Sequence, residues 1–312
     1  MKATSVFTLT MQTCVNTPCK LVRIGVGLLL LVMDTLPYEF CDSVVSIIDE
    51  LGYLRELVIE LSAHRFNIWT AAINDDSLNR RKVNIGFGYN DFPVIDSPES
   101  PFESISLEDL RKVPKKHLRI ERINWTGEQL SASDFKTLQY INEIGNCSTL
   151  DIGINSSTSE DKKRFAEYMK NISFSEITLH RPYEAVLRHQ AQSKVIARLV
   201  LSGFGWCKGI QPVVEKILLT NPIDYAKISW DFSFGNDFLE KLFDVPCLTS
   251  KKEFQFQIKN LLEFLNLYTK LGTNRSVDRV SWRRHDGVLV VMTRLRSTIF
   301  SFQFSKSCKV LL

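Results

Sequence analysis

The sequence predicts an α/β protein, in which a short N-terminal helical element precedes irregular strand–helix units and a cap made of a C-terminal helix and an antiparallel hairpin. Three observations predict this fold. Apolar residues near the N-terminus recur at three- and four-residue spacing, a strand-like signature then alternates with helical stripes, and a period-2 alternation appears near the C-terminus. We expect five segments: residues 1–32, 33–63, 64–106, 107–249 and 250–312.

The composition limits the class of protein. The chain has 312 residues, of which 44% are hydrophobic and 24% charged, and 39 Lys and Arg oppose 35 Asp and Glu. These proportions are typical of globular proteins and exclude disordered, collagen-like and polytopic membrane proteins. A formal charge of +4 is too small to indicate nucleic-acid binding by itself.

Seven cysteines are scattered along the chain, and none belongs to a C-x-x-C pair. Their low density excludes a small disulfide scaffold, and the spacing of zinc ligands is missing. The simplest interpretation is a set of reduced thiols. We therefore expect an intracellular protein of the cytoplasm or nucleus.

Residues 1–32 are interpreted as an apolar leader or an upstream extension. The run Ile24 to Val32 has the length of a signal-peptide core, is short for a transmembrane helix, and is followed by no small-residue cleavage site. Two interpretations stay open: residues 24–32 act as an uncleaved membrane anchor or signal, or translation begins at Met33. Glycans would mark the secretory route. The candidate sequons begin at Asn124, Asn146, Asn155, Asn171 and Asn274.

Residues 33–63 predict a pair of short amphipathic helices. Pro37 suits a first helical position, and Glu39 and Asp42 place negative charge in the first turn, where the helix dipole favours it. The first helix ends at Gly52. Its apolar positions are Phe40, Val44, Ile47, Ile48 and Leu51, and those of the second helix are Leu54, Leu57, Val58 and Leu61.

Residues 64–106 predict a short β segment and a linker. The β-like run alternates through Val83, Ile85, Phe87 and Tyr89. Residues 90–106 hold three prolines among Asp and Ser, which is typical of a linker or a long surface loop. We expect the domain boundary in this stretch.

Residues 107–249 repeat an apolar-x-x-apolar-x-apolar signature of a short strand. Successive copies start 27, 22 and 27 residues apart, near the leucine-rich-repeat range of about 20–29 residues. Helical stripes lie between the copies, so we expect a parallel sheet with helices outside it; an ordinary layered α/β domain is the alternative. The signatures start at Cys147, Phe174, Ile196 and Ile223, after a weaker copy from Leu118, and the stripes begin at Phe135, Phe165, Val213 and Phe238.

Residues 250–312 predict the cap. Ser250 and Glu253 match a capping box before an apolar helix that runs through Leu261 to Tyr268 and stops at Gly272. Strands at 277–283 and 288–293 then flank an Asp-Gly turn, and a third strand follows at 298–304.

No motif of catalysis, cofactor binding or metal binding is found. The glycine clusters at 85–88 and 203–209 lack phosphate-loop spacing, and the five histidines lack ligand spacing. Basic clusters are interrupted by acids, so we expect no nucleic-acid partner. The group Trp230, Asp231, Phe232 and Phe234 is either a partner-contacting patch or core under a loop, and we favour core.

The segment Leu36-Pro37-Tyr38-Glu39-Phe40, followed by Val44, Ile47, Ile48 and Leu51, resembles the opening of an F-box. With Trp69 and Asn79-Arg80 further on, the chain is similar to the divergent F-box and F-box-associated families expanded in nematodes. The resemblance implies docking to a Skp-type linker subunit of a cullin ubiquitin ligase. The residues it assigns to this contact are Leu36, Pro37, Phe40, Val44 and Ile48.

The expected function is therefore non-catalytic: a substrate-recruiting adaptor whose repeat face binds an unidentified protein target. Two alternatives stay open. One is a repeat-type binding module with no ligase role, expected if the helix at 36–51 is buried against its own domain. The other is a secreted or membrane-tethered repeat protein that uses residues 24–32.

Overall fold

The computed structural model describes most of the chain from residue 71 to residue 306, together with Tyr38 and Cys41. The predicted apolar run at 24–32, most of the helical pair at 36–61 and the predicted helix at 261–268 lie outside the described residues. The described ranges are 71–72, 74–75, 78–88, 93–98, 100–126, 130–145, 147–153, 158–193, 195–245, 251–258, 274–276, 279–283, 288–295 and 299–306.

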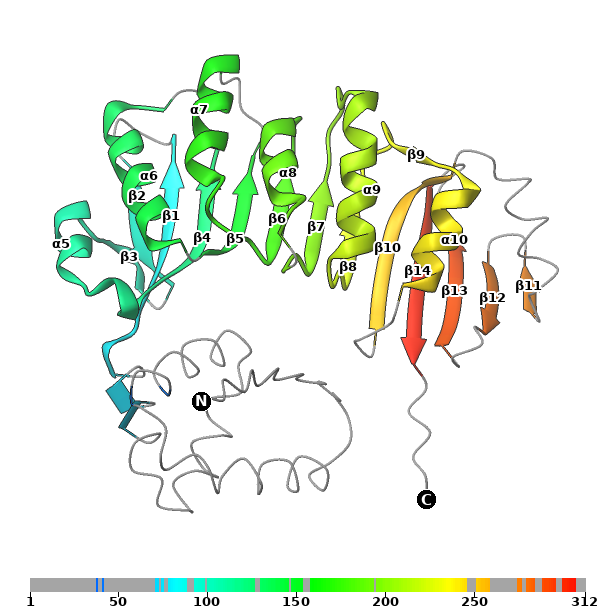
Figure 1. Ribbon diagram of the computed structural model, residues 1–312, viewed down its shortest axis with the longest axis horizontal. Helices are drawn as coiled ribbons and strands as arrows, with labels where there is room; N and C mark the ends of the chain where they lie inside the picture. Colours follow the sequence, from blue (N-terminus) through cyan, green and yellow to red (C-terminus); the bar gives the residue numbers. More distant parts are fainter. Residues whose placement is uncertain are drawn as a thin grey trace, which may run out of the picture.

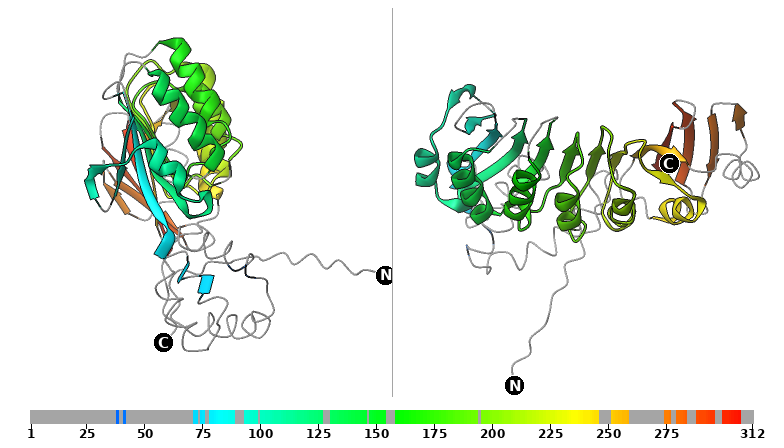
Figure 2. Two further views of the ribbon diagram at one scale, coloured as in Figure 1. Left: turned by 90° about the vertical axis from the view of Figure 1, so that its left-hand side faces the viewer. Right: turned by 90° about the horizontal axis from the view of Figure 1, so that it is seen from above.

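The described residues form an α/β arrangement around one mixed sheet of 14 strands (Figure 1). Its order is β11-β12-β13-β14-β10-β8-β7-β6-β5-β4-β1-β2-β3, and β9 pairs with β10. Helices α6 to α10 all lie against the same face of this sheet (Figures 1 and 2). The predicted fold class, α/β with alternating strands and helices, is confirmed.

The central part repeats a strand–helix unit, and each strand lies parallel to the next. All five strand signatures of the sequence overlap strands of this run, and those that start at Phe174, Ile196 and Ile223 begin two residues before their strands. Helix α8 was not expected, because it has only seven residues and carries little of a helical stripe. In chain order the elements are β4 (Leu118–Trp125), α6 (Ala132–Ile144), β5 (Cys147–Ile152), α7 (Ser159–Met169), β6 (Glu176–Leu179), α8 (Glu184–Gln190), β7 (Arg198–Leu201), η2 (Lys208–Ile210), α9 (Gln211–Thr220), β8 (Tyr225–Lys227), β9 (Ser233–Phe234) and α10 (Asn236–Asp244).

The stretch expected to be a linker, 90–106, instead contains two strands. β1 pairs in parallel with β4 and antiparallel with β2, so these strands extend the same sheet. Pro101 is tolerated because β3 is the edge strand, where a missing N–H breaks no ladder. The elements of this part are β1 (Arg81–Phe87), β2 (Val94–Ser97), β3 (Ser100–Ser104), α5 (Leu107–Lys112) and η1 (Lys115–His117).

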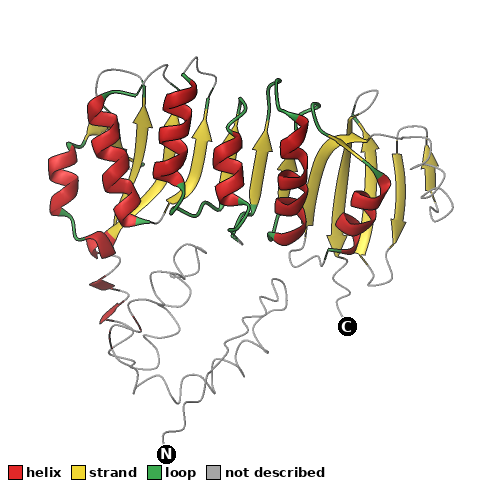
Figure 3. Ribbon diagram, turned by 45° about the horizontal axis from the view of Figure 1, so that its top comes forward, coloured by secondary structure: helices red, strands yellow, loops and turns green. Residues whose placement is uncertain are grey.

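The predicted capping box at Ser250 to Glu253 is wrong, because β10 (Lys251–Ile258) occupies these positions. Buried Phe254, Phe256 and Ile258 alternate with more exposed polar residues, and this period-2 pattern outweighs a local capping motif. β10 is parallel to β8 on one side and antiparallel to β14 on the other (Figure 3).

The antiparallel hairpins of the cap are confirmed. The strands are β11 (Asn274–Ser276), β12 (Arg279–Arg283), β13 (Val288–Arg294) and β14 (Ile299–Lys306).

One apolar core lies between the helices and the covered face of the sheet. In the central part, Trp125 packs on Phe165 with ring centroids 4.6 Å apart, and a phenylalanine cluster continues the core into the cap. Two buried amides join successive units. Gln190 Nε2 donates to Ile172 O at 2.6 Å, and Asn221 Oδ1 accepts from Ile196 N at 3.1 Å.

Candidate interaction surface

The other face of the sheet carries no described helix, and we call it the open face (Figure 2). Side chains alternate along each strand, so every second residue points away from the core. Strand register lines these residues up in two rows, whose members are half-buried or exposed. The first row is Arg122, Thr149, Glu176, Arg198, Tyr225 and Glu253, and the second is Asn124, Asp151, Thr178, Val200, Lys227 and Gln255.

Charges of both signs lie on the open face. Arg122, Glu176, Arg198 and Lys227 are exposed. The guanidinium of Arg198 lies 4.5 Å from the centroid of the Tyr225 ring, which is a cation–π contact. These side chains present charged groups in fixed register and are not part of the core.

Hydrogen bonds join the three loops that follow β6, β7 and β8. His180 Nδ1 and Ser202 Oγ are 2.8 Å apart, and Ser229 Oγ donates to Gly203 O at 2.6 Å. Trp206 Nε1 donates to Ser202 O at 3.1 Å within its own loop, while Trp206 N donates to Asp231 Oδ2 at 3.0 Å in the next. The carboxyl ends of these parallel strands therefore form one cross-linked edge.

Gly203 is required for this close approach. Its φ of 75° lies in the left-handed region, and an added Cβ would be only 2.3 Å from His180 O. Glycine alone accommodates both conditions.

The same edge exposes two large aromatic side chains. Phe204 is 61% exposed and Trp230 is 53% exposed, and each directly follows a member of the Ser229–Gly203 hydrogen bond. The guanidinium of Arg181 lies 5.5 Å from the Phe204 ring centroid. We call Arg181, Phe204 and Trp230 the carboxyl-edge ridge.

Of the aromatic group at 230–234, Phe232 and Phe234 are buried, as the core interpretation expects, whereas Trp230 is exposed. Trp230 lies in the turn between β8 and β9, so the alternation of a strand does not govern its direction. Trp206, in the glycine cluster 203–209, is also buried and packs against Phe232 with tilted rings whose centroids are 5.7 Å apart. That cluster therefore works as a packed turn.

Asp151, His180 and Ser202 lie in sequence across the edge, but their geometry does not resemble a nucleophilic triad. Ser202 bonds Nδ1 of His180, whereas Asp151 Oδ1 lies 3.8 Å from Nε2, beyond a hydrogen bond. His180 and Asp151 are also substantially exposed, so the carboxylate is poorly placed to orient the ring. The contact joins loops and offers no activated hydroxyl.

The five residues predicted to contact a ligase subunit, Leu36, Pro37, Phe40, Val44 and Ile48, lie outside the described residues. Their neighbour Tyr38 is described, and its hydroxyl donates to Asp75 Oδ2 at 3.0 Å. Asp75 also accepts from Asn79 Nδ2 at 2.7 Å and from Lys116 Nζ at 3.2 Å. The Tyr38 hydroxyl, followed by Lys116, holds the pKa of Asp75 below its ordinary value.

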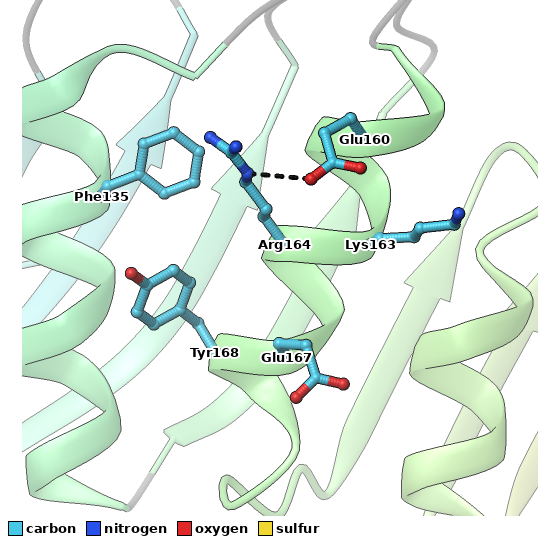
Figure 4. Close-up of a pocket in the computed structure, with 6 residues that line it drawn as sticks. All are labelled: Phe135, Glu160, Lys163, Arg164, Glu167 and Tyr168. Carbon is cyan, nitrogen blue, oxygen red and sulfur yellow. Dashed lines mark hydrogen bonds and ion pairs between the residues drawn. The ribbon is translucent and has the colours of Figure 1, made fainter.

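A shallow groove of about 450 Å³ lies between α6 and α7 on the helical face (Figure 4). Arg164 crosses it, bonded to Glu160 at 3.1 Å and lying 5.8 Å from the Phe135 ring centroid. The charges of Arg164 and Glu160 are thus engaged with each other. Among the residues that the structure describes, no group of three His, Cys, Asp or Glu side chains could hold a metal ion.

The fold and these surfaces define an α/β protein with one helix-covered and one polar, open sheet face. The chain matches no protein-family model, no curated protein and no solved structure. Within the described part of the chain, no helix combines the length and the apolar character needed to cross a membrane.

Proposed function

We propose that the chain is a non-catalytic protein-interaction protein, an F-box-type adaptor that brings a protein target to a cullin ubiquitin ligase. Residues 33–63 dock to a Skp-type linker subunit, and the open face with its carboxyl edge binds the target. The mechanism is proximity, because a target held near a charged ubiquitin-conjugating enzyme reacts at a raised effective concentration. The adaptor acts in the cytoplasm or nucleus.

The observation that carries the proposal is the open face. Its two rows cross six neighbouring strands in continuous register. At about 4.8 Å between strands, each row extends over roughly 24 Å, which matches the length of about seven extended peptide residues. Such a surface suits recognition of another chain better than it suits enclosure of a small molecule.

The ligase contact is tested by pull-down of the full chain with the Skp-type subunit. We expect the wild-type chain to retain the subunit and a Leu36→Ala/Pro37→Ala double variant to lose it, because both side chains would enter the interface. Leu78→Ala is the matched control, since Leu78 is 82% exposed and lies outside the F-box-like segment. Absence of binding by the folded wild-type chain contradicts the adaptor role.

A second candidate is a binding module with no ligase role, and the Tyr38–Asp75 hydrogen bond favours it. Cys41, which like Tyr38 has helical backbone, is fully buried. Both observations fit a helix that packs against its own domain. In that case the pull-down yields no Skp-type subunit while the target surface still binds.

A further inference from the structure

We propose that the carboxyl-edge ridge and the cations beside it form a recognition site for an acidic peptide segment that carries an apolar anchor residue. This inference rests on the part of the proposed function in which the chain binds a protein target, and it names the chemistry of that target. Trp and Arg dominate binding energy in known interfaces, and both occur in the ridge.

The first argument is exposure on a rigid support. Phe204 and Trp230 are two of the few large apolar side chains that the described residues expose by about half or more, and they come from adjoining loops. Four loop hydrogen bonds hold their backbones in place. Preorganised anchors lose little conformational entropy on binding, so such a pair is well suited to capture a partner's apolar side chain.

The second argument is charge. Arg181 stacks on Phe204, and Lys208 and Lys227 are exposed on the adjoining loop and strand. Acids also lie on the same loops and on neighbouring elements: Asp231, which already accepts the Trp206 N–H, Asp151 on β5 and Glu184 on α8. A stacked guanidinium keeps its N–H edge free for a carboxylate, so the site offers directed donors beside apolar surface.

Aromatic rings beside cations also suit single-stranded nucleic acid. The open face nevertheless exposes Glu176 beside Arg198 and carries the half-buried Asp151, and these carboxylates repel a continuous phosphate backbone. A peptide can place single carboxylates opposite single cations and avoid the acids. The observations therefore favour a peptide.

A random dodecamer library displayed on phage tests the proposal with the full chain as bait. We expect enriched peptides to combine Asp or Glu with an aromatic or aliphatic residue. Resynthesised, they should bind at least roughly tenfold more weakly to Phe204→Ala/Trp230→Ala and to Arg181→Ala/Lys227→Ala, and binding should weaken with salt. Circular dichroism should show that these substitutions, at exposed or half-buried positions, leave the fold intact.

Val195→Ala and Arg188→Ala are the matched controls, because Val195 is 48% exposed and Arg188 is exposed, and both lie away from the ridge. They should bind the peptides as the wild type does. The inference is overturned if no peptide is enriched or if the enriched peptides lack acids. It is also overturned if the ridge variants bind the peptides as tightly as the wild type does, or if a single-stranded oligouridine displaces the peptides from the wild-type chain. The peptide experiment contains no ligase subunit. Its outcome therefore does not depend on the outcome of the Skp-type pull-down, and either can fail without the other.

Discussion

At the residue scale, two glycines with similar backbone angles differ in what surrounds them. Gly145 has φ of 77° and nothing within 4 Å of an added Cβ, whereas Gly203 faces His180 O. Gly145→Ala should cost about 1–2 kcal/mol, the penalty of a left-handed L-residue. Gly203→Ala should cost roughly 3 kcal/mol or more because the loop must also move.

Urea denaturation of the two variants measures this difference directly. The Gly145 variant is the control for backbone angle alone. Equal losses in the free energy of unfolding would show that the close approach to His180 does not constrain the loop. The Gly203 variant should also displace Phe204 and weaken peptide binding.

The carboxylates of two aspartates, each in the first turn of a helix, should contribute to stability with opposite dependence on pH. Asp134 is buried in the α6 capping box, and burial raises its pKa although Ser131 bonds lower it. Asp109 occupies the equivalent position in α5, where Lys112 and Ser106 lower its pKa. The stability that Asp134 contributes is therefore lost as pH rises through its raised pKa in the folded chain. The stability that Asp109 contributes is lost in the other direction, as pH falls below 3.8 and through its lowered pKa in the folded chain.

We expect Asp134→Asn to gain stability relative to wild type as pH rises from about 4 to 7, since the amide oxygen still accepts from Ser131 N at its 2.7 Å position. Asp109→Asn should instead lose a little stability over the same range. Chemical denaturation at both pH values checks the signs. A pH-independent difference for Asp134→Asn would contradict the burial argument.

At the element scale, the strands of the central run were predictable because each buries the apolar positions of its signature, and because the signature recurs at similar intervals along the chain. β10 was not, since four residues that match a capping box say nothing about the phenylalanines that follow. The prediction of a linker at 90–106 was wrong for a related reason. Prolines 93 and 98 border β2 rather than interrupt it, and Pro101 falls on an edge strand.

Asp75 connects Tyr38 to the amino end of β4, because it accepts hydrogen bonds from Tyr38 and Lys116, and η1, which contains Lys116, immediately precedes β4. Tyr38→Phe removes the hydroxyl donor, so we expect faster amide hydrogen exchange over residues 36–41 near neutral pH. The Asp75 pKa lies below 3.8 in the folded chain, so the contact stabilises above about pH 4 and is lost as pH falls through the lower value.

Tyr168→Phe is the control for this exchange experiment, because Tyr168 packs against Phe135 on the helical face, at a ring distance of 6.0 Å. It should leave exchange over 36–41 unchanged. Unchanged exchange in Tyr38→Phe would show that the Asp75 contact does not hold the segment. Stronger Skp-type binding by Tyr38→Phe would show that the contact competes with docking.

At the scale of the whole molecule, the sequence predicts the layers better than the surfaces. The positions between the apolar residues of each strand signature, such as Asp151 and Thr178, are the open-face residues, so their exposure follows from periodicity. Their alignment in rows depends on strand order and register, which the sequence does not state. The ridge depends further on loop contacts, such as Ser229 to Gly203, between residues 26 positions apart.

β1 lies inside the sheet, between β4 and β2, although it is the first strand among the described residues. Being parallel to β4, it begins at the amino ends of the strands, on the side of Asp75, whereas the ridge lies at the carboxyl ends. The eight residues of β4 alone extend roughly 26 Å at about 3.3 Å each. A partner bound near Tyr38 and a peptide bound to the ridge would therefore contact opposite ends of the strands. The two sites could be occupied at the same time.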